Sequence, residues 1–186
     1  MSEKHFHIPH CLIDHLTATD HRSFEACFEK LCARLRAADE QRKETHPSWL
    51  GALDIEHARL DNDQHEHPFS NEALLLVSFV LRETIRSTDQ LFRFGGGELF
   101  VIFERTARTG VDIALERMRS TLAGYSFPEV GSITINAGYT QILPGDIPTM
   151  CALRADTALH DAKCRGRNTA HSHERLVRIE APLQHR

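Results

Sequence analysis

The sequence of 186 residues lacks the features typical of membrane, secreted and nucleic-acid-binding proteins. Its longest apolar run, residues 73–81, is far shorter than the ~20 residues needed to span a bilayer. No charged and apolar leader is visible, so we expect a cytoplasmic protein with no membrane partner. Lysine and arginine total 22 against 26 acidic residues, a net charge of −4, which argues against binding to a nucleic-acid polymer.

The sequence contains both cysteine and histidine, but these residues do not have the spacing of a zinc-binding module. The five cysteines include no CxxC pair, so we expect reduced thiols. Histidine is abundant, with 13 residues against 10 glycines, and such an excess can indicate metal binding or pH sensing. Because no Cys/His group has the spacing of a zinc module, we interpret most of these histidines as solvated surface residues.

Apolar periodicity predicts alternating helices and strands. Helices are predicted at residues 24–35, 71–85, 111–122 and 149–163. Strands are predicted at residues 48–55, 91–94, 99–103, 132–141 and 175–179. Strands separated by helices favour an α/β fold, with one central sheet of about five strands flanked by helices.

Several residues in or next to these predicted helices and strands are of types that can bind the phosphate groups of a nucleotide. Asp54 lies near the end of a hydrophobic strand, where α/β folds place ligands. The turn Gly95–Gly97 has no Cβ atoms, so a phosphate could approach its backbone, and Glu98 follows directly. Lys163 and Arg167 are four residues apart near a helix end and can point the same way. Taken singly, each feature is more often a tight turn or a solvated surface pair.

Five segments, taken in order, match one family pattern. They are residues 14–24, 54–63, 67–71, 93–99 and 155–168. They look like the motifs D-x-L-T-G-L-x-N-R-x-x-F, D-x-D-x-F-K-x-x-N-D, G-H with a following G-D, R-x-G-G-D-E-F and A-D-x-A-L-Y-x-A-K-x-x-G-R-N. The sequence therefore resembles the GGDEF family, the diguanylate cyclase domain of bacterial signalling. The resemblance implies a nucleotidyl-cyclase-like α/β fold whose sheet is mostly antiparallel.

The resemblance covers almost the whole chain. We therefore expect a degenerate GGDEF domain at residues 11–180, between an N-terminal tail at 1–10 and a C-terminal tail at 181–186. The tails are expected to be poorly ordered. No sensor, receiver or output domain is recognisable in the sequence, so a signal would have to pass through contact with another protein or a second copy.

The resemblance implies a metal site that is degraded in this sequence. Family members join two GTP molecules into cyclic di-GMP across an antiparallel dimer, with metal ions on the triphosphate. The implied metal ligands are the Asp54 carboxylate, the Ile55 carbonyl and an acid where this sequence has Gly97. Glu98 remains and could partly substitute. Mg²⁺ requires near-octahedral oxygen coordination, so the lost carboxylate predicts weak or absent catalysis, with Mg²⁺ bound only if GTP still binds.

The implied GTP pocket is altered as well. Asn62 keeps a guanine contact, whereas Asn71 replaces an aspartate and offers a neutral amide in place of a charged acceptor. Arg59 stands for a phosphate-contacting lysine, and Lys163 and Arg167 match other phosphate contacts. We expect residual, less selective GTP binding at most.

One local group of histidines borders this implied pocket. It consists of His57, His65 and His67. Whether this group has a role at the pocket stays open at the level of sequence.

A second implied site is intact. Arg86-Ser87-Thr88-Asp89 matches the family's inhibitory R-x-x-D site, at the family distance before Gly95, and Arg117 takes the place of a second arginine. A guanidinium can donate two hydrogen bonds to guanine O6 and N7, and it pairs with phosphate. An ordinary helix-end ion pair is the alternative, but the register with Gly95 and Arg117 favours a cyclic di-GMP site.

These residues support three hypotheses. The favoured one is a catalytically degenerate GGDEF domain that binds cyclic di-GMP through Arg86, Asp89 and Arg117. It would signal as a homodimer or through a protein partner. The second is a weak diguanylate cyclase that uses Asp54 and Glu98 and is inhibited by its product. The third is an interaction module in which both nucleotide sites are vestigial.

Overall fold

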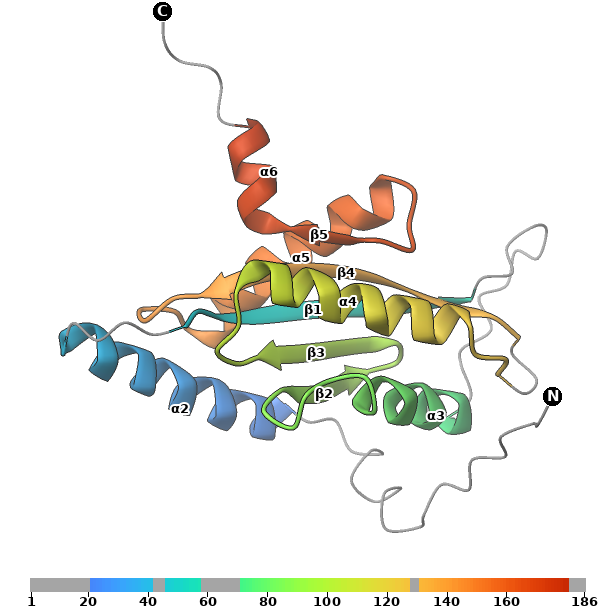
Figure 1. The fold of residues 1–186 in the computed structure, drawn as a ribbon, viewed down its shortest axis with the longest axis horizontal. Coiled ribbons are helices and arrows are strands. Elements are labelled where there is room, and N and C mark those ends of the chain that lie inside the picture. The colour runs from blue at the N-terminus through green and yellow to red at the C-terminus, as the bar shows by residue number, and fades with distance from the viewer. Residues whose placement is uncertain (1–20, 42–45, 58–70, 128–130, 181–186) are drawn as a thin grey trace, which may run out of the picture.

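The computed structural model describes residues 21–41, 46–57, 71–127 and 131–180 (Figure 1). The helices are α2 (His21–Glu40), α3 (Asn71–Arg82), α4 (Arg108–Ala123), α5 (Pro148–Cys164) and α6 (His173–Glu180). The strands are β1 (Ser48–His57), β2 (Gln90–Gly95), β3 (Glu98–Phe103), β4 (Ile133–Ile142) and β5 (Ala170–Ser172). Both predicted tails lie outside the described residues, as do residues 14–20 of the first matching segment.

The sheet has five strands in the order β2-β3-β1-β4-β5. β1 pairs antiparallel with both β3 and β4, and β2 pairs antiparallel with β3. Only the pair β4–β5 is parallel. The predicted α/β fold with a mostly antiparallel central sheet is therefore confirmed.

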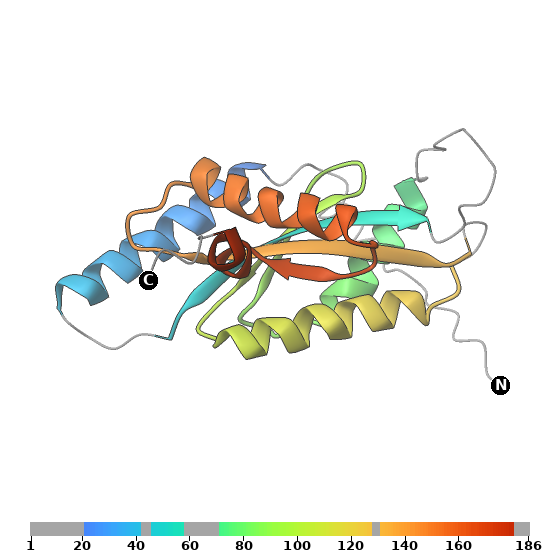
Figure 2. The same ribbon diagram turned by 90° about the horizontal axis from the view of Figure 1, so that it is seen from above.

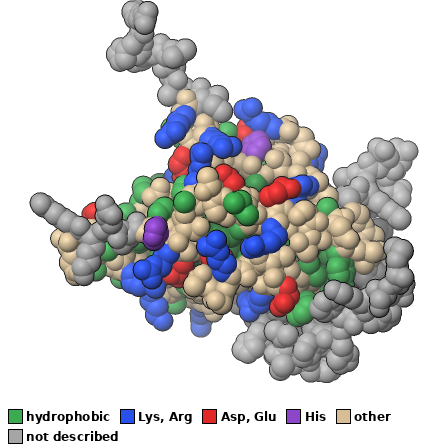
Figure 3. All heavy atoms as spheres, in the orientation of Figure 1, with side chains coloured by type: hydrophobic (Ala, Val, Ile, Leu, Met, Phe, Trp, Pro, Cys, Tyr) green, Lys and Arg blue, Asp and Glu red, His purple; other side chains and the backbone are tan. Residues whose placement is uncertain are grey.

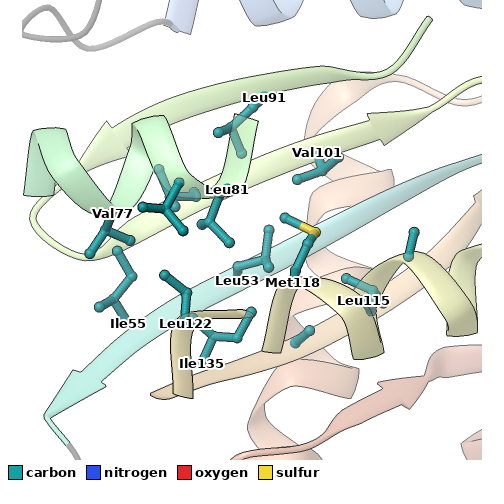
Figure 4. Packing of buried hydrophobic residues seen from close by; sticks show 14 of the residues in the cluster. Leu53, Ile55, Val77, Leu81, Leu91, Val101, Leu115, Met118, Leu122 and Ile135 are labelled. Atoms are coloured by element: carbon teal, nitrogen blue, oxygen red, sulfur yellow. The ribbon is translucent and has the colours of Figure 1, made fainter. Parts of the chain in front are cut away.

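Two hydrophobic cores cover the two faces of this sheet. Alternate residues of β1 point to opposite faces, so Trp49, Leu53 and Ile55 join one core while Leu50 and Ala52 join the other. α3 and α4 close the first core, which Figure 4 shows from close by. α2 and α5 close the second. Seen from above in Figure 2, α4 and α5 lie on opposite sides of the sheet.

The strand predicted at residues 175–179 is wrong, because this segment belongs to α6. The fifth strand is instead the short β5, directly before it. Glu174 lies in the first turn of α6 and Arg178 in the last, so both charges favour the helix dipole. A short stretch with mixed apolar and basic residues does not distinguish helix from strand by pattern alone.

Within the described residues, no helix is long and apolar enough to cross a membrane. The four cysteines in this part of the chain are free thiols, as predicted. Cys32 and Cys151 are buried, and burial raises the pKa of both thiols, that of Cys151 to about 12. These two thiols therefore stay protonated at neutral pH and pack as small apolar residues.

α5 packs closely on β4 because small residues face each other. Its buried side is formed by Cys151, Ala155, Ala158 and Ala162. A Cβ atom built on Gly138 of β4 would lie 2.0 Å from the backbone nitrogen of Leu159 and 2.2 Å from the carbonyl oxygen of Ala155. Only glycine allows the helix backbone to approach this strand so closely.

We therefore predict that Gly138→Ala destabilises the fold. The added methyl group meets helix backbone rather than a side chain that can rotate away, so we expect a loss of about 3 kcal/mol or more. Urea unfolding followed by circular dichroism measures this loss. Gly145→Ala is the matched control, because no atom lies within 4 Å of its added Cβ. Equal stability of the two variants would contradict the prediction.

Glu174 anchors α6 to β4. Its carboxylate accepts hydrogen bonds from Thr140 Oγ1 at 2.7 Å, from the Gln141 backbone N–H at 2.8 Å and from Ser172 Oγ at 2.7 Å. Burial alone would raise the pKa of Glu174, but these hydrogen bonds favour the charged form and the net pKa is lowered. The carboxylate therefore stabilises the fold above the ordinary pKa of glutamate, and this contribution is lost as pH falls through the lowered value.

We expect Glu174→Gln to lower the free energy of unfolding by about 1–2 kcal/mol at pH 7, because charged hydrogen bonds are replaced by neutral ones. The difference from the wild type should shrink as the solution is acidified toward pH 3. Thermal unfolding between pH 3 and 7 measures both effects. Glu29→Gln, on an exposed position of α2, is the control. A pH-independent difference would show that the charge is not what holds α6.

Candidate functional site

The Gly-rich turn between β2 and β3 brings two predicted acids together at one end of the sheet. Asp54 of β1 is the register partner of Glu98 at the start of β3. The backbone N–H of Ile55 donates to the carbonyl oxygen of Gly97 at 3.0 Å. Gly95 and Gly96 have φ angles of 156° and 47°, which glycine adopts with little strain. The turn therefore holds Glu98 directly beside Asp54.

α5 adds charged side chains to this end of the sheet. Lys163 Nζ lies 2.8 Å from Asp54 Oδ2, and these side chains are 34% and 20% exposed. Arg167, just beyond α5, places Nε 3.2 Å from Oε1 of Glu56. Both predicted phosphate-binding cations are thus ion-paired with acids of β1.

Asp156 also belongs to this group. Burial raises its pKa, the nearby charge of Glu98 raises it further, and Lys163 lowers it. Asp156 precedes Lys163 by two helical turns, so both side chains lie on one face of α5. We call Asp54, Glu98, Asp156 and Lys163 the sheet-end cluster.

The residues of this cluster do not fit a divalent metal. Gly97 offers no carboxylate, and a Cβ added there would lie 3.2 Å from the Ile55 carbonyl oxygen. In the described part of the chain, no group of three histidine, cysteine, aspartate or glutamate side chains is placed to hold a metal ion. Asp54, the principal predicted ligand, instead contacts the ammonium group of Lys163.

The other predicted site lies in the turn that leads from α3 into β2. The backbone N–H of Asp89 donates to the Arg86 carbonyl oxygen at 3.0 Å. In return, the Arg86 N–H donates to Asp89 Oδ2 at 3.2 Å, and the Glu104 N–H donates to Asp89 Oδ1 at 3.3 Å. Asp89 is 9% exposed. The Asp89 carboxylate therefore holds the backbone of the turn in place, and it also gives the turn a negative charge.

Arg86, Asp89 and Arg117 line one small cavity of about 50 Å³ between this turn and α4. Thr106 and the exposed Ile113 contribute to the same cavity. Arg86 and Asp89 also border a larger cavity of about 480 Å³, which reaches Arg82 on α3 and Ser23 on α2. Arg86, Asp89 and Arg117, which the sequence analysis grouped into one predicted site, are therefore neighbours in space. Figure 3 looks onto the face covered by α4 and shows basic side chains spread across it.

Comparison with known proteins settles the family. The family model described as "Diguanylate cyclase, GGDEF domain" matches residues 12–169. The chain belongs to this family. Diguanylate cyclase DgcP of Pseudomonas aeruginosa is 34% identical over 122 residues, which cover 64% of this chain and 18% of DgcP. Probable diguanylate cyclase DgcC of Escherichia coli is 31% identical over 133 residues, or 70% of this chain and 36% of DgcC. This chain therefore spans only a minor part of these relatives' length.

Solved GGDEF domains share the fold. The active GGEEF domain of a diguanylate cyclase from Vibrio cholerae superposes with a TM-score of 0.66 at 27% identity, over 82% of this chain and 95% of that domain. The GGDEF domain of DgcB from Caulobacter crescentus, in complex with c-di-GMP, gives 0.61 at 27% identity, over 81% and 90%. Diguanylate cyclase SiaD of Pseudomonas aeruginosa, in complex with its activator SiaC, gives 0.62 at 26% identity, over 77% and 57%.

Two residues of the predicted GTP pocket of this GGDEF domain, Arg59 and Asn62, lie outside the described residues. So do His65 and His67 of the histidine group that borders the pocket. The side chains of His57 and Asn71 also lie outside the description, although the backbone of both residues is described. Their predicted roles, and the local histidine group, therefore stay predictions.

Sequence reasoning missed Asp156 and Glu56 as members of the charged end of the sheet. A signal for each was present in the spacing. Asp156 precedes Lys163 by seven residues on one helix, and Glu56 follows Asp54 by two residues on one strand, so each shares a face with a predicted site residue. Neither pattern says which acid pairs with which cation.

Proposed function

We propose that this GGDEF domain is a receptor for cyclic di-GMP that has lost the metal-dependent synthesis of that molecule, and that it signals through contact with another protein or a second copy. The observation that carries the proposal is the convergence of Arg86, Asp89 and Arg117 on one cavity. The sheet-end cluster supports the loss of metal-dependent synthesis, because its acids are not arranged to hold a metal ion.

The three converging side chains suit a guanine nucleotide. A guanidinium donates to guanine O6 and N7 and also pairs with phosphate. Each Asp89 oxygen accepts one backbone hydrogen bond and keeps a lone pair for the guanine N1–H and N2–H groups. Among the described side chains, neither Arg86 nor Arg117 forms an ion pair, whereas Arg119 on the same helix is paired with Glu116. Both guanidinium groups therefore retain the capacity to bind a ligand.

Two neighbours add support. The DgcB domain, which shares this fold, is in complex with c-di-GMP. SiaD is in complex with an activator protein, which gives a precedent for a GGDEF protein that acts through protein contact. The larger cavity beside Arg86 has the volume of ordinary small-molecule sites, so the surface near the turn has room for a dinucleotide.

Isothermal titration calorimetry with cyclic di-GMP tests the receptor half. We expect the wild type to bind, and Arg117→Ala and Arg86→Ala each to weaken binding by about tenfold to a hundredfold. This range corresponds to the loss of charge-assisted hydrogen bonds worth about 1.5–3 kcal/mol. Arg119→Ala is the matched control, since it removes a guanidinium from the same helix but not from the cavity.

Two results would overturn the receptor proposal. One is a wild-type protein that gives no binding heat at any concentration reached. The other is equal affinity in Arg117→Ala and Arg119→Ala. Asp89 variants are less informative, because the Asp89 carboxylate also holds the turn together.

Incubation with GTP and either Mg²⁺ or Mn²⁺, followed by chromatography, tests the loss of synthesis. We expect no cyclic di-GMP even at high protein concentration, because Gly97 supplies no carboxylate and Asp54 is paired with Lys163. Glu98→Gln is run in parallel to identify a contaminating cyclase. Product that forms with the wild type and disappears with Glu98→Gln would instead establish the weak-cyclase hypothesis.

A further inference from the structure

Six large hydrophobic side chains are exposed among the described residues, and four of them gather at the N-terminal end of α5. They are Leu143, Ile147, Met150 and Leu153, which are 47%, 55%, 52% and 60% exposed. Ile147, Met150 and Leu153 follow one another at intervals of three residues, so their side chains are neighbours on one helix face. Leu143 lies in the turn directly before α5, where its backbone N–H donates to Asp146 Oδ2 at 2.8 Å. We call these four residues the α5 patch.

The α5 patch lies outside the hydrophobic core. The core side of the same helix is formed by Cys151, Ala155, Ala158 and Ala162. A helix at the surface of a globular protein normally has one apolar face, toward the core, and a polar face toward water. The first half of α5 is therefore apolar on two sides. Four large apolar side chains, each about half exposed, amount to a few hundred Å² of contiguous surface, and a patch of that size marks a contact site.

Two helices flank the α5 patch on opposite sides. Arg36 of α2 donates from Nε to the Pro144 carbonyl oxygen at 2.7 Å, which places the C-terminal end of α2 beside the patch. On the other side, Glu174 of α6 and Arg154 of α5 share the hydroxyl group of Thr140. Figure 1 accordingly shows α5 between α2, below it, and α6, above it.

These flanking helices carry opposite charges. Asp39 and Glu40 follow Arg36 of α2 by three and four residues, so they lie on the same side of that helix as Arg36. Arg178 follows Glu174 of α6 by four residues and likewise shares its side of the helix. Asp39, Glu40 and Arg178 are exposed and form no ion pair with another described side chain. The patch therefore has free acids on one side and a free cation on the other.

A second copy of the chain fits this arrangement. An interface of standard size covers about 800 Å² on each partner, and about 65% of a homodimer interface is apolar. The α5 patch supplies the apolar centre of such an area, and the charged sides of α2 and α6 supply its polar rim. With a two-fold axis that runs along α5, the acidic end of α2 in each copy faces Arg178 of the other. The attraction between them then occurs twice.

We infer that the α5 patch is the interface of a two-fold dimer of this chain, with the axis along α5. The inference rests on the proposed function in one respect, because it names the surface through which a second copy makes the signalling contact. α4 and α5 lie on opposite sides of the sheet (Figure 2). The dimer therefore leaves the cavity beside Arg117 of α4 available to the dinucleotide.

Sedimentation velocity of the full chain without nucleotide tests the inference, at concentrations up to about 100 μM, because standard interfaces dissociate at micromolar concentrations or below. We expect the wild type to form dimers. Leu153→Glu and Met150→Glu should each weaken the dimer by at least about tenfold, because the two-fold axis places two unpaired charges in the interface. Ile113→Glu is the matched control, since Ile113 is 67% exposed on α4, outside the patch, and it should dimerise as the wild type does. Circular dichroism of each variant confirms that it is folded.

A charge-swap series tests the direction of the axis. We expect Arg178→Glu and Glu40→Lys each to weaken the dimer by about threefold to tenfold, because each variant sets like charges opposite one another at two places. The double variant, Arg178→Glu with Glu40→Lys, should recover most of the wild-type affinity, because opposite charges face each other again.

Three outcomes would overturn the inference. The first is a wild type that stays monomeric at the highest concentration. The second is a dimer that Leu153→Glu and Ile113→Glu weaken equally, and the third is a double charge variant that dimerises no better than the single ones. Calorimetry with cyclic di-GMP separates this test from the receptor proposal. Dinucleotide binding by a chain that does not dimerise would refute only the dimer, and a dimer that binds no dinucleotide would refute only the receptor.

Discussion

The close approach of α5 to β4 at Gly138 is the constraint on which the charged end of the sheet depends. Small residues on α5 and a glycine on β4 bring helix backbone and strand backbone into contact. That contact sets where the last turn of α5 ends, and so where Lys163 meets Asp54. Because β1 pairs with both β3 and β4, the same arrangement places Glu98 next to Asp54. Backbone packing thus positions the side-chain charges.

The hairpin formed by β2 and β3 separates two regions of opposite character. One end holds the Gly-rich turn and the acids around Lys163, and the other end holds the turn with Arg86 and Asp89 next to Arg117. At the first end, Lys163 and Arg167 are paired with acids of β1. At the second, two guanidinium groups line a cavity without ion pairs among the described side chains. The two ends therefore differ in whether their cations are already paired. At the first end the cations are neutralised by the chain's own acids, whereas the second end is suited to an anionic ligand.

Most of the fold follows from patterns that operate over a few residues. The buried apolar run of β1, the alternation of apolar residues in β4, the Gly-rich hairpin turn and the helical stripes of α2 and α4 each act locally, and the structure confirms these elements. The error at residues 175–179 has the same origin, because a short segment carries too few periods to distinguish helix from strand. Glu174 ties the first turn of α6 to β4 through hydrogen bonds from Thr140 and Gln141, which lie more than 30 residues away in the chain.

The sequence by itself determined the family, the two candidate sites and the missing acid at Gly97, because motif spacing and residue type are local properties of the chain. The convergence of Arg86 and Asp89 with Arg117 was predicted from the family register, and tertiary structure brings them to one cavity. Only tertiary structure decided that Lys163 pairs with Asp54 and that Asp156 joins them. Ion pairing depends on distances between residues far apart in the chain, and packing of α5 against the sheet sets those distances.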